Sequence, residues 1–255
     1  MSEPVLVEHY GDVAIVTLNV PEKRNALGVA LYCGLSQTLT SLQDDPSVRA
    51  LVLYGGTHFC SGGDLSSLDA TPLAMRSAMH VGHRAVRALI GGRLPAVAAV
   101  AGSAFGAGFS IAMACDFVVG DPSTTLCAAF GKVALTPDYG LLWTLPQRIG
   151  IGRTRELLML CRQVGAEEAL SMHLIDRLVA PGETLEAALQ LAKELAAASP
   201  GAIATTKAML SRAPLSLDTM LAWEADTQSL LARTLDLQEG IRAFAERRPP
   251  AFRGE

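Results

Sequence analysis

Twice in this sequence a run of strand-forming residues leads into a glycine-rich turn and then into a helical stretch. The first run, 50–54 (ALVLY), precedes GGTHFCSGGDL, and the second, 96–100 (AVAAV), precedes AGSAFGAG and a helix expected over 109–115. Alternation of strands and helices is typical of domains in which right-handed crossovers join parallel strands. The repeat therefore predicts an α/β fold.

Further elements are expected on both sides of this repeat. Two β-rich runs, 5–9 and 13–18, are separated by Tyr10-Gly11-Asp12, which indicates a hairpin. From residue 152 onward the pattern is almost entirely helical. We place a core at residues 1–198 and a C-terminal helical subdomain at 199–255. The remaining expectations are strands at 117–119 and 126–130, and helices at 29–43, 153–161, 166–172, 185–198, 202–212 and 215–244.

The amino-acid composition indicates which binding partners this chain has and which it lacks. Half of the residues are hydrophobic and 18% are charged, which indicates a deep core, buried subunit contacts and hence a homo-oligomer. The net charge is −4, and Lys and Arg are scattered, so we predict no nucleic acid and no anionic membrane surface as a partner. The five cysteines contain no C-x-x-C pair, which argues against a disulfide framework or a zinc cluster and favours a cytoplasmic location.

One uncharged run, 94–115, approaches the length of a membrane span, which needs about 20 apolar residues. Pro95 and several glycines interrupt it, so we predict a buried strand, a tight turn and a buried helix instead. The N-terminal residues, MSEPVLVEHY, lack the basic and long apolar regions of a secretory signal.

The two glycine turns suggest a site for negative charge. A strand that enters such a turn and leaves as a helix exposes backbone N–H groups beside a helix N-terminus. For one turn alone, tight packing is a sufficient explanation. A pair, around Gly62–Gly63 and Gly106–Gly108, favours two donors aimed at one oxygen. Phosphate-loop, dinucleotide and hydrolase-elbow motifs are absent from the sequence, and the His80/His83 pair is interpreted as a helix face rather than a metal site.

Five segments, taken in order, resemble the enoyl-CoA hydratase/isomerase (crotonase) superfamily over nearly the whole chain. They are PEKRNAL, FCSGGDL, AGSAFGAGFSIAMACD, ALTPDYG followed by LPQRIG, and EGIRAFAERRPPAF. The resemblance implies a crotonase-like spiral of ββα units that binds and transforms an acyl-CoA thioester. It also implies that residues 199–255 cover the active site and form trimers or dimers of trimers. Coenzyme A would enter as part of the substrate, with no prosthetic group and no metal.

The resemblance also assigns residues to this site. The two oxyanion donors fall on the backbone N–H groups of Gly63 and Ala107; the family usually has glycine at the second position, but a backbone donor survives the change. Loss of one such donor typically costs about 2.7–4 kcal/mol of transition-state stabilisation. The residues expected to bind the acyl-CoA are Arg24, Ala26, Leu27, Ser61, Gly62, Gly63, Asp64, Leu65 and Phe130.

Departures from the family pattern bear on the reaction. Hydratases of the family use two glutamates, and the matching positions here hold Ser110 and Phe130, neither of which does a glutamate's work. Asp138, in TPDYG, matches the acid of isomerase-like members. Apolar neighbours such as Phe130 and Leu135 are expected to raise the pKa of Asp138 by desolvation. Without the resemblance, Pro-Asp-x-Gly would be explained as a turn.

Three functions therefore stay open: an enoyl-CoA isomerase, which we favour, an enoyl-CoA hydratase that uses a non-standard route, and a non-catalytic acyl-CoA-binding protein.

Residues between 65 and 89 are expected to shape the acyl pocket. Several other side chains receive structural roles: Asp64 as a helix N-cap, Asp116 in packing, Glu224 and Asp226 on a solvated face, and Trp143 and Trp223 in the core, with Trp143 also a candidate for the acyl pocket.

Overall fold

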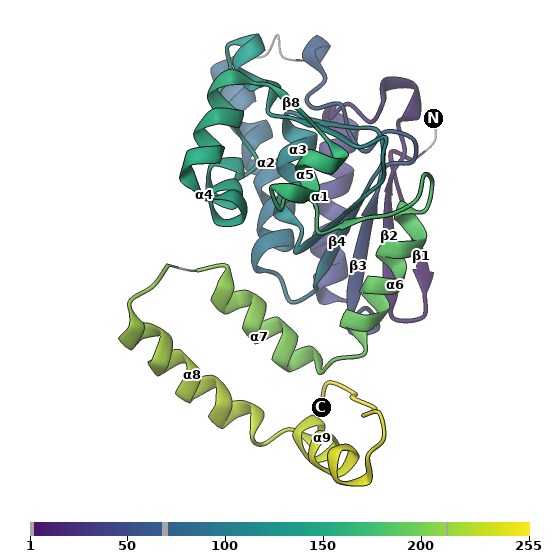
Figure 1. Ribbon diagram of the computed structural model, residues 1–255, viewed down its shortest axis with the longest axis vertical. Coiled ribbons are helices and arrows are strands. Elements are labelled where there is room, and N and C mark those ends of the chain that lie inside the picture. The colour runs from purple at the N-terminus through teal and green to yellow at the C-terminus, as the bar shows by residue number, and fades with distance from the viewer. Residues whose placement is uncertain (1–2, 68–70, 213) are drawn as a thin grey trace.

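The main sheet of the protein is almost entirely parallel (Figure 1). The computed structural model describes residues 3–67, 71–212 and 214–255. The strand order is β1-β2-β3-β4-β6-β9, in which only the β1–β2 hairpin is antiparallel. This arrangement confirms the predicted hairpin and α/β class. The strands are β1 (Val5–Tyr10), β2 (Val13–Leu18), β3 (Ala50–Tyr54), β4 (Ala96–Val100), β6 (Phe117–Gly120) and β9 (Arg177–Leu178).

A second, smaller sheet has the order β5-β7-β8. A ββα unit takes one strand from the main sheet and one from this sheet, followed by a helix. Strand β4 is followed by β5 (Ser103–Phe105) and helix α3 (Ala107–Ala114), and β6 is followed by β7 (Thr125–Cys127) and, after a 3-10 turn, α4 (Leu141–Leu160). After β3, Cys60 forms a parallel bridge with Ala104 of β5 before α2 (Pro72–Gly91) begins. These successive units confirm the predicted spiral. Strand β8 (Gln163–Gly165) completes the second sheet.

Side chains of the main sheet pack on both of its faces. In β2, Ala14, Val16 and Leu18 belong to the large core under the helices, whereas Val13 and Ile15 belong to a second core against α6 (Thr184–Ala196). This alternation follows from the two-residue period of a strand. Because both faces are covered, the parallel strands consist almost entirely of apolar residues. The large core also receives side chains of α1 (Val29–Asp44), α2, α3 and α4.

Some element boundaries differ from the sequence predictions. Helix α4 begins at Leu141 rather than at 153, and it bends at Gly150, where φ is +73°. The helix predicted over 215–244 is two helices, α8 (Leu217–Leu231) and α9 (Leu235–Glu246), because the Thr234 side chain caps the second one. The strand predicted over 126–130 ends at residue 127. Residue 130 lies instead in the 3-10 turn 129–133.

Helix α7 (Pro200–Leu210) attaches the C-terminal helices to the α/β body. In Figure 1, α7, α8 and α9 extend from one end of that body. The buried Lys207 donates to the Leu94 carbonyl at 2.7 Å and pairs with the Asp116 carboxylate. That carboxylate also accepts a hydrogen bond from the Ala96 N–H at 2.7 Å. Asp116 therefore has the packing role that the sequence suggests. The short helix α5 (Ala166–Ser171) lies earlier in the chain.

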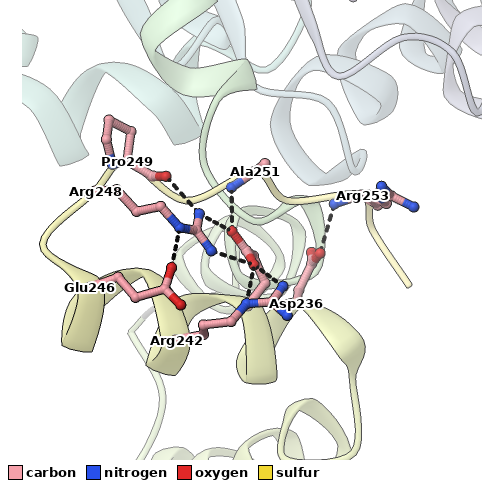
Figure 2. A network of polar contacts seen from close by, with 8 residues as sticks. Asp236, Arg242, Glu246, Arg248, Pro249, Ala251 and Arg253 are labelled. Carbon is pink, nitrogen blue, oxygen red and sulfur yellow. Dashed lines mark hydrogen bonds and ion pairs between the residues drawn. The ribbon is translucent and has the colours of Figure 1, made fainter.

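The last residues fold back along α9, held by two of its carboxylates (Figure 2). Asp236 accepts hydrogen bonds from the backbone N–H of Arg253 (2.7 Å) and from the Ser199 hydroxyl (3.0 Å). Glu239 pairs with Arg242 and Arg248 and accepts from the Ala251 N–H. The chain end is thus tied to α9, and Asp236 also ties α9 to Ser199, the residue that precedes α7.

The predictions for the two tryptophans and the uncharged run have different outcomes. Trp143 is 43% exposed, so its assignment to the core is wrong. Trp223 is partly buried under the Arg212 guanidinium, 4.5 Å from the ring centre, but it belongs to neither hydrophobic core, so its assignment to the core is also wrong. Glu224 and Asp226 are exposed, as predicted. The run 94–115 divides into β4, β5 and α3, and none of the helices in the described ranges combines the length and apolarity needed to cross a membrane.

Candidate active site

The two glycine turns lie against each other. The Cys60 N–H donates to the Ser103 carbonyl at 3.0 Å, and the Phe105 N–H donates to the Cys60 carbonyl at 2.9 Å. At Gly62, φ is +102°, and a Cβ there would lie 2.9 Å from the Phe105 carbonyl oxygen. A Cβ at Gly108 would lie 2.4 Å from the Cys60 carbonyl oxygen. Only glycine allows the turns to approach this closely.

Each turn contributes one of the two predicted donor residues to the lining of the same cavity. Ala107 is the first residue of α3, and the first four N–H groups of a helix have no acceptor within it. Gly63 lies between two hydrogen bonds, from the Leu27 N–H to the Gly62 carbonyl (2.7 Å) and from the Asp64 N–H to the Leu27 carbonyl (3.3 Å). Its own N–H takes part in neither bond. Gly63 and Ala107 both line the cavity, which the prediction of an oxyanion site requires.

A buried asparagine supports the first turn. The Asn25 amide donates to the carbonyls of Gly55 (2.7 Å), His58 (2.9 Å) and Phe59 (3.3 Å), and its carbonyl oxygen accepts from the Val20 N–H (2.9 Å). Its backbone is left-handed, with φ +54°, which asparagine tolerates better than most residues. In the sequence, Asn25 stands out only as the last of three polar residues, Lys23-Arg24-Asn25, that precede Ala26. Its role depends on contacts with residues about 30 positions away, which no local motif displays.

The cavity between the turns and α2 has a volume of about 480 Å³, which is within the usual range for small-molecule sites, about 300–1,000 Å³. Arg24 and Ala26 are outside its lining, and their role in binding the acyl-CoA stays a prediction. The Arg24 carbonyl accepts from the Ser61 N–H at 2.9 Å and so holds the turn. The predicted residues that do line the cavity are Leu27, Ser61, Gly62, Gly63, Asp64, Leu65, Ala107, Phe130 and Asp138.

Residues of the predicted pocket region 65–89 also line the cavity. Ala74, Met75, Ala78 and Met79 face it from α2; residues 68–70 of this region lie outside the described part of the chain. Trp143 is not part of this lining, and its place in an acyl pocket stays a prediction. The wall is therefore mainly apolar and contains flexible methionines, which adapt to ligands of different shape.

Asp138 provides the carboxyl group in this apolar wall. Its Oδ1 atom is buried and has no hydrogen-bond partner among the described residues. Burial raises the pKa of Asp138 from its usual 3.8 to about 7, in the predicted direction and for the predicted reason. Its backbone carbonyl accepts from the Leu141 N–H at 3.1 Å, so the turn interpretation is also correct. A carboxyl group that titrates near neutral pH can both accept and donate a proton.

The other polar side chains are less suited to proton transfer. The Ser110 hydroxyl is buried in α3, donates to the Gly106 carbonyl at 3.3 Å and is not part of the lining. Hydrogen bonds from Lys23 and Ser66 hold the pKa of Asp64 at about 2, so Asp64 stays ionised. Asp64 accepts from the Ser66 N–H at 3.1 Å, as the predicted N-cap would. Over the described ranges, no three His, Cys, Asp or Glu side chains gather as a metal site would require.

Comparison with known proteins identifies what this arrangement is similar to. Residues 8–255 match the model of the family described as enoyl-CoA hydratase/isomerase. A Thermus thermophilus protein named "Putative enoyl-CoA hydratase" is 37% identical over 95% of this chain and 98% of its own length. The Escherichia coli 1,2-epoxyphenylacetyl-CoA isomerase is 34% identical over 100% of both chains.

A solved structure confirms the same fold. The crystal structure of an enoyl-CoA hydratase from Polaromonas sp. JS666 superposes with a TM-score of 0.92 at 32% identity, covering 97% of this chain and 99% of that chain. Relatives named hydratase and relatives named isomerase therefore share this architecture, so likeness alone does not select the reaction.

Proposed function

Because this chain belongs to the enoyl-CoA hydratase/isomerase family, we propose that it binds an acyl-CoA thioester and shifts a double bond by proton transfer through Asp138. The observation that carries this proposal is the Asp138 carboxyl group. It lies in an apolar cavity, has one buried oxygen with no partner among the described residues, and shares the cavity with Gly63 and Ala107.

The proposed reaction starts from a 3-enoyl thioester. The Asp138 carboxylate removes a proton from C2, and the electron pair moves toward the thioester oxygen to give a dienolate. Hydrogen bonds from the Gly63 and Ala107 N–H groups stabilise that oxygen, assisted by the positive end of α3. Protonated Asp138 then delivers the proton to C4, which leaves the double bond between C2 and C3. Proton and electron pair balance within the substrate and one carboxyl group.

The composition of the cavity favours this reaction over water addition. Hydration by the family's usual route needs two glutamates, and the residues at those positions are Ser110, which bonds within α3, and the apolar Phe130. One carboxyl group suffices for a proton shuttle between two carbons. The coenzyme A moiety would enter as part of the substrate, and the reaction needs no prosthetic group.

The test is conversion of 3-enoyl-CoA to 2-enoyl-CoA by the purified protein. We expect wild-type turnover, and a loss of about 10²–10⁴ in kcat for Asp138→Asn, which keeps the shape but cannot accept the proton. Glu224→Gln, on an exposed helix face, is the matched control and should keep wild-type rates. Unchanged substrate in the presence of bound acyl-CoA would contradict the isomerase proposal.

A second candidate function is hydration by an altered route, favoured by the names of most of the similar proteins. It predicts 3-hydroxyacyl-CoA from crotonyl-CoA and loss of that product in Asp138→Asn. The third hypothesis is a non-catalytic acyl-CoA-binding protein. It predicts that Asp138→Ala leaves acyl-CoA binding intact and that no thioester is turned over.

We also propose that the chain forms a homotrimer or a dimer of trimers through its C-terminal helices. Supporting this, large apolar side chains of α8 and α9 are exposed in the single chain, among them Leu217, Leu230, Ile241 and Phe244. A cytoplasmic location stays a prediction that rests on the cysteine pattern.

A further inference from the structure

A glycine in the middle of α2 makes room for an aromatic ring beside the acid. Glycine in a helix interior is less favourable than alanine. At Gly82, however, a Cβ would lie 2.4 Å from the Tyr139 hydroxyl oxygen, 2.6 Å from its Cζ and 2.8 Å from its Cε1. Contacts this short cannot form. The absence of a side chain at Gly82 is therefore what allows the end of the Tyr139 ring to lie against α2.

Tyr139 is held in an unusual backbone conformation. Its φ is +47°, in the left-handed region that a bulky residue adopts only under strain. The side chain is 3% exposed. Burial of an aromatic ring contributes enough free energy to offset such strain. The ring thus fixes the backbone at 139, the residue directly after Asp138.

We propose that Tyr139 is a positioning residue: its ring, seated against Gly82, fixes the left-handed backbone at 139 and so directs the Asp138 carboxyl group into the cavity. The importance of this arrangement for turnover rests on the proposed function. The orientation of the carboxyl group does not, and it can be measured separately.

The surroundings of the ring suit a positioning role. Burial raises the pKa of Tyr139, and the titratable groups whose charges act on it, Asp138, Cys60, Tyr32 and Cys33, raise it further. Tyr139 therefore stays neutral near pH 7. Burial of the Asp138 carboxyl group, rather than a charged neighbour, raises the pKa of Asp138. A change that turns the Asp138 carboxyl group toward water should accordingly lower its pKa.

The test is a 13C NMR titration of the Asp138 carboxyl carbon in Gly82→Ala. The added methyl displaces the ring, the backbone at 139 relaxes, and the Asp138 pKa should fall from about 7 toward its usual 3.8. In assays of isomerisation we expect kcat to fall about tenfold or more, with a much smaller change in KM. The reason is that the substitution misplaces the Asp138 carboxyl group and leaves the rest of the cavity in place.

The matched control is Gly91→Ala in the same helix. A Cβ at Gly91 would lie 3.6 Å from the Ser211 hydroxyl oxygen, an ordinary contact, so the pKa of Asp138 and kcat should stay at their wild-type values. Tyr139→Phe keeps the ring and should keep the raised pKa of Asp138. A wild-type Asp138 pKa in folded Gly82→Ala would overturn the proposal.

A double-mutant cycle shows whether Gly82 acts through the ring. Tyr139→Leu shortens the side chain and should lower the Asp138 pKa on its own. Adding Gly82→Ala to it should then change kcat and the pKa little further, because no ring tip is left to displace. If instead the two substitutions reduce kcat by independent factors that multiply in the double variant, Gly82 does not act through the Tyr139 ring. If Gly82→Ala does not fold, Tyr139→Leu decides: a raised pKa retained there overturns the proposal.

The titration also separates this inference from the proposed function. Wild-type protein that lacks isomerase activity, but whose Asp138 pKa falls in Gly82→Ala, would refute the reaction and leave the positioning role supported. Active wild-type protein whose Asp138 pKa stays unchanged in Gly82→Ala and in Tyr139→Leu would support the reaction and refute the positioning role.

Discussion

At the scale of single residues, the placement of Asp138 favours function over stability. Burial removes the Asp138 carboxyl group from water and so disfavours its charged form, and the pKa of about 7 is the expected consequence. Asp64 shows the opposite case, since ion pairing and hydrogen bonds stabilise its charge. Two carboxyl groups at one cavity therefore differ in protonation because their surroundings differ.

The raised pKa predicts a pH dependence of isomerisation. The free enzyme must hold ionised Asp138 to accept a proton, so kcat/KM should rise about tenfold per pH unit below pH 7 and level off above it. Measurement of kcat/KM on both sides of that value checks this. A profile whose midpoint lies near 4, the ordinary value for aspartate, would show that Asp138 is not desolvated in solution.

At the scale of elements, Lys207 connects α7 to the body of the protein. Its buried ammonium group binds the Leu94 carbonyl and the Asp116 carboxylate. Lys207→Ala removes one partner of this pair and should lower the free energy of unfolding by about 3 kcal/mol. Lys193→Ala, on the exposed side of α6, is the control and should change it by less than about 0.5 kcal/mol. Urea denaturation measures both, and equal effects would contradict the anchoring role.

Elements with a strong local pattern could be predicted from the sequence. The runs of β2, β3 and β4 were located to the residue, because an apolar strand with both faces buried stands out between turns. The first half of α4 was missed, since Pro146 and Gly150 suggest a loop and the helix depends on packing of Leu141 and Leu145 in the core. Strand β8 has three residues and exists through its pairing with β7.

The candidate site divides in the same way. The glycine turns and the Asp138 segment are local in sequence and can be recognised there, while the chemistry assigned to Asp138 is what the family resemblance implies. The supports of the site are long-range: Asn25 bonds to the loop after β3, and Gly82 accommodates Tyr139. A helix glycine or a polar loop residue does not show its partner in the sequence, so the structure was needed to find both.

At the scale of the whole molecule, the C-terminal helices α8 and α9 carry several exposed large apolar side chains. Phe244, on α9, is 88% exposed. Exposed apolar surface of this kind marks association sites. We expect sedimentation analysis to give a mass of three or six times 26.8 kDa.

Charged substitutions should weaken that assembly. Combining Phe244→Glu with Ile241→Glu, both exposed on α9, should shift the protein toward monomer, while Gln238→Glu on the same helix should not. A monomeric wild-type protein, or an assembly indifferent to both apolar positions, would contradict the proposed role of α9.

Proton exchange with solvent tests the central claim, that Asp138 moves a proton on an enolate held by Gly63 and Ala107. The protein is incubated in deuterated water with a panel of acyl- and enoyl-CoA thioesters, and incorporation at C2 and C4 is followed by mass spectrometry for wild type and Asp138→Asn. We predict deuterium at these carbons with wild type and a loss of about 10²–10⁴ in rate with the variant. Binding without exchange, or exchange that is equal in the two proteins, would contradict the claim.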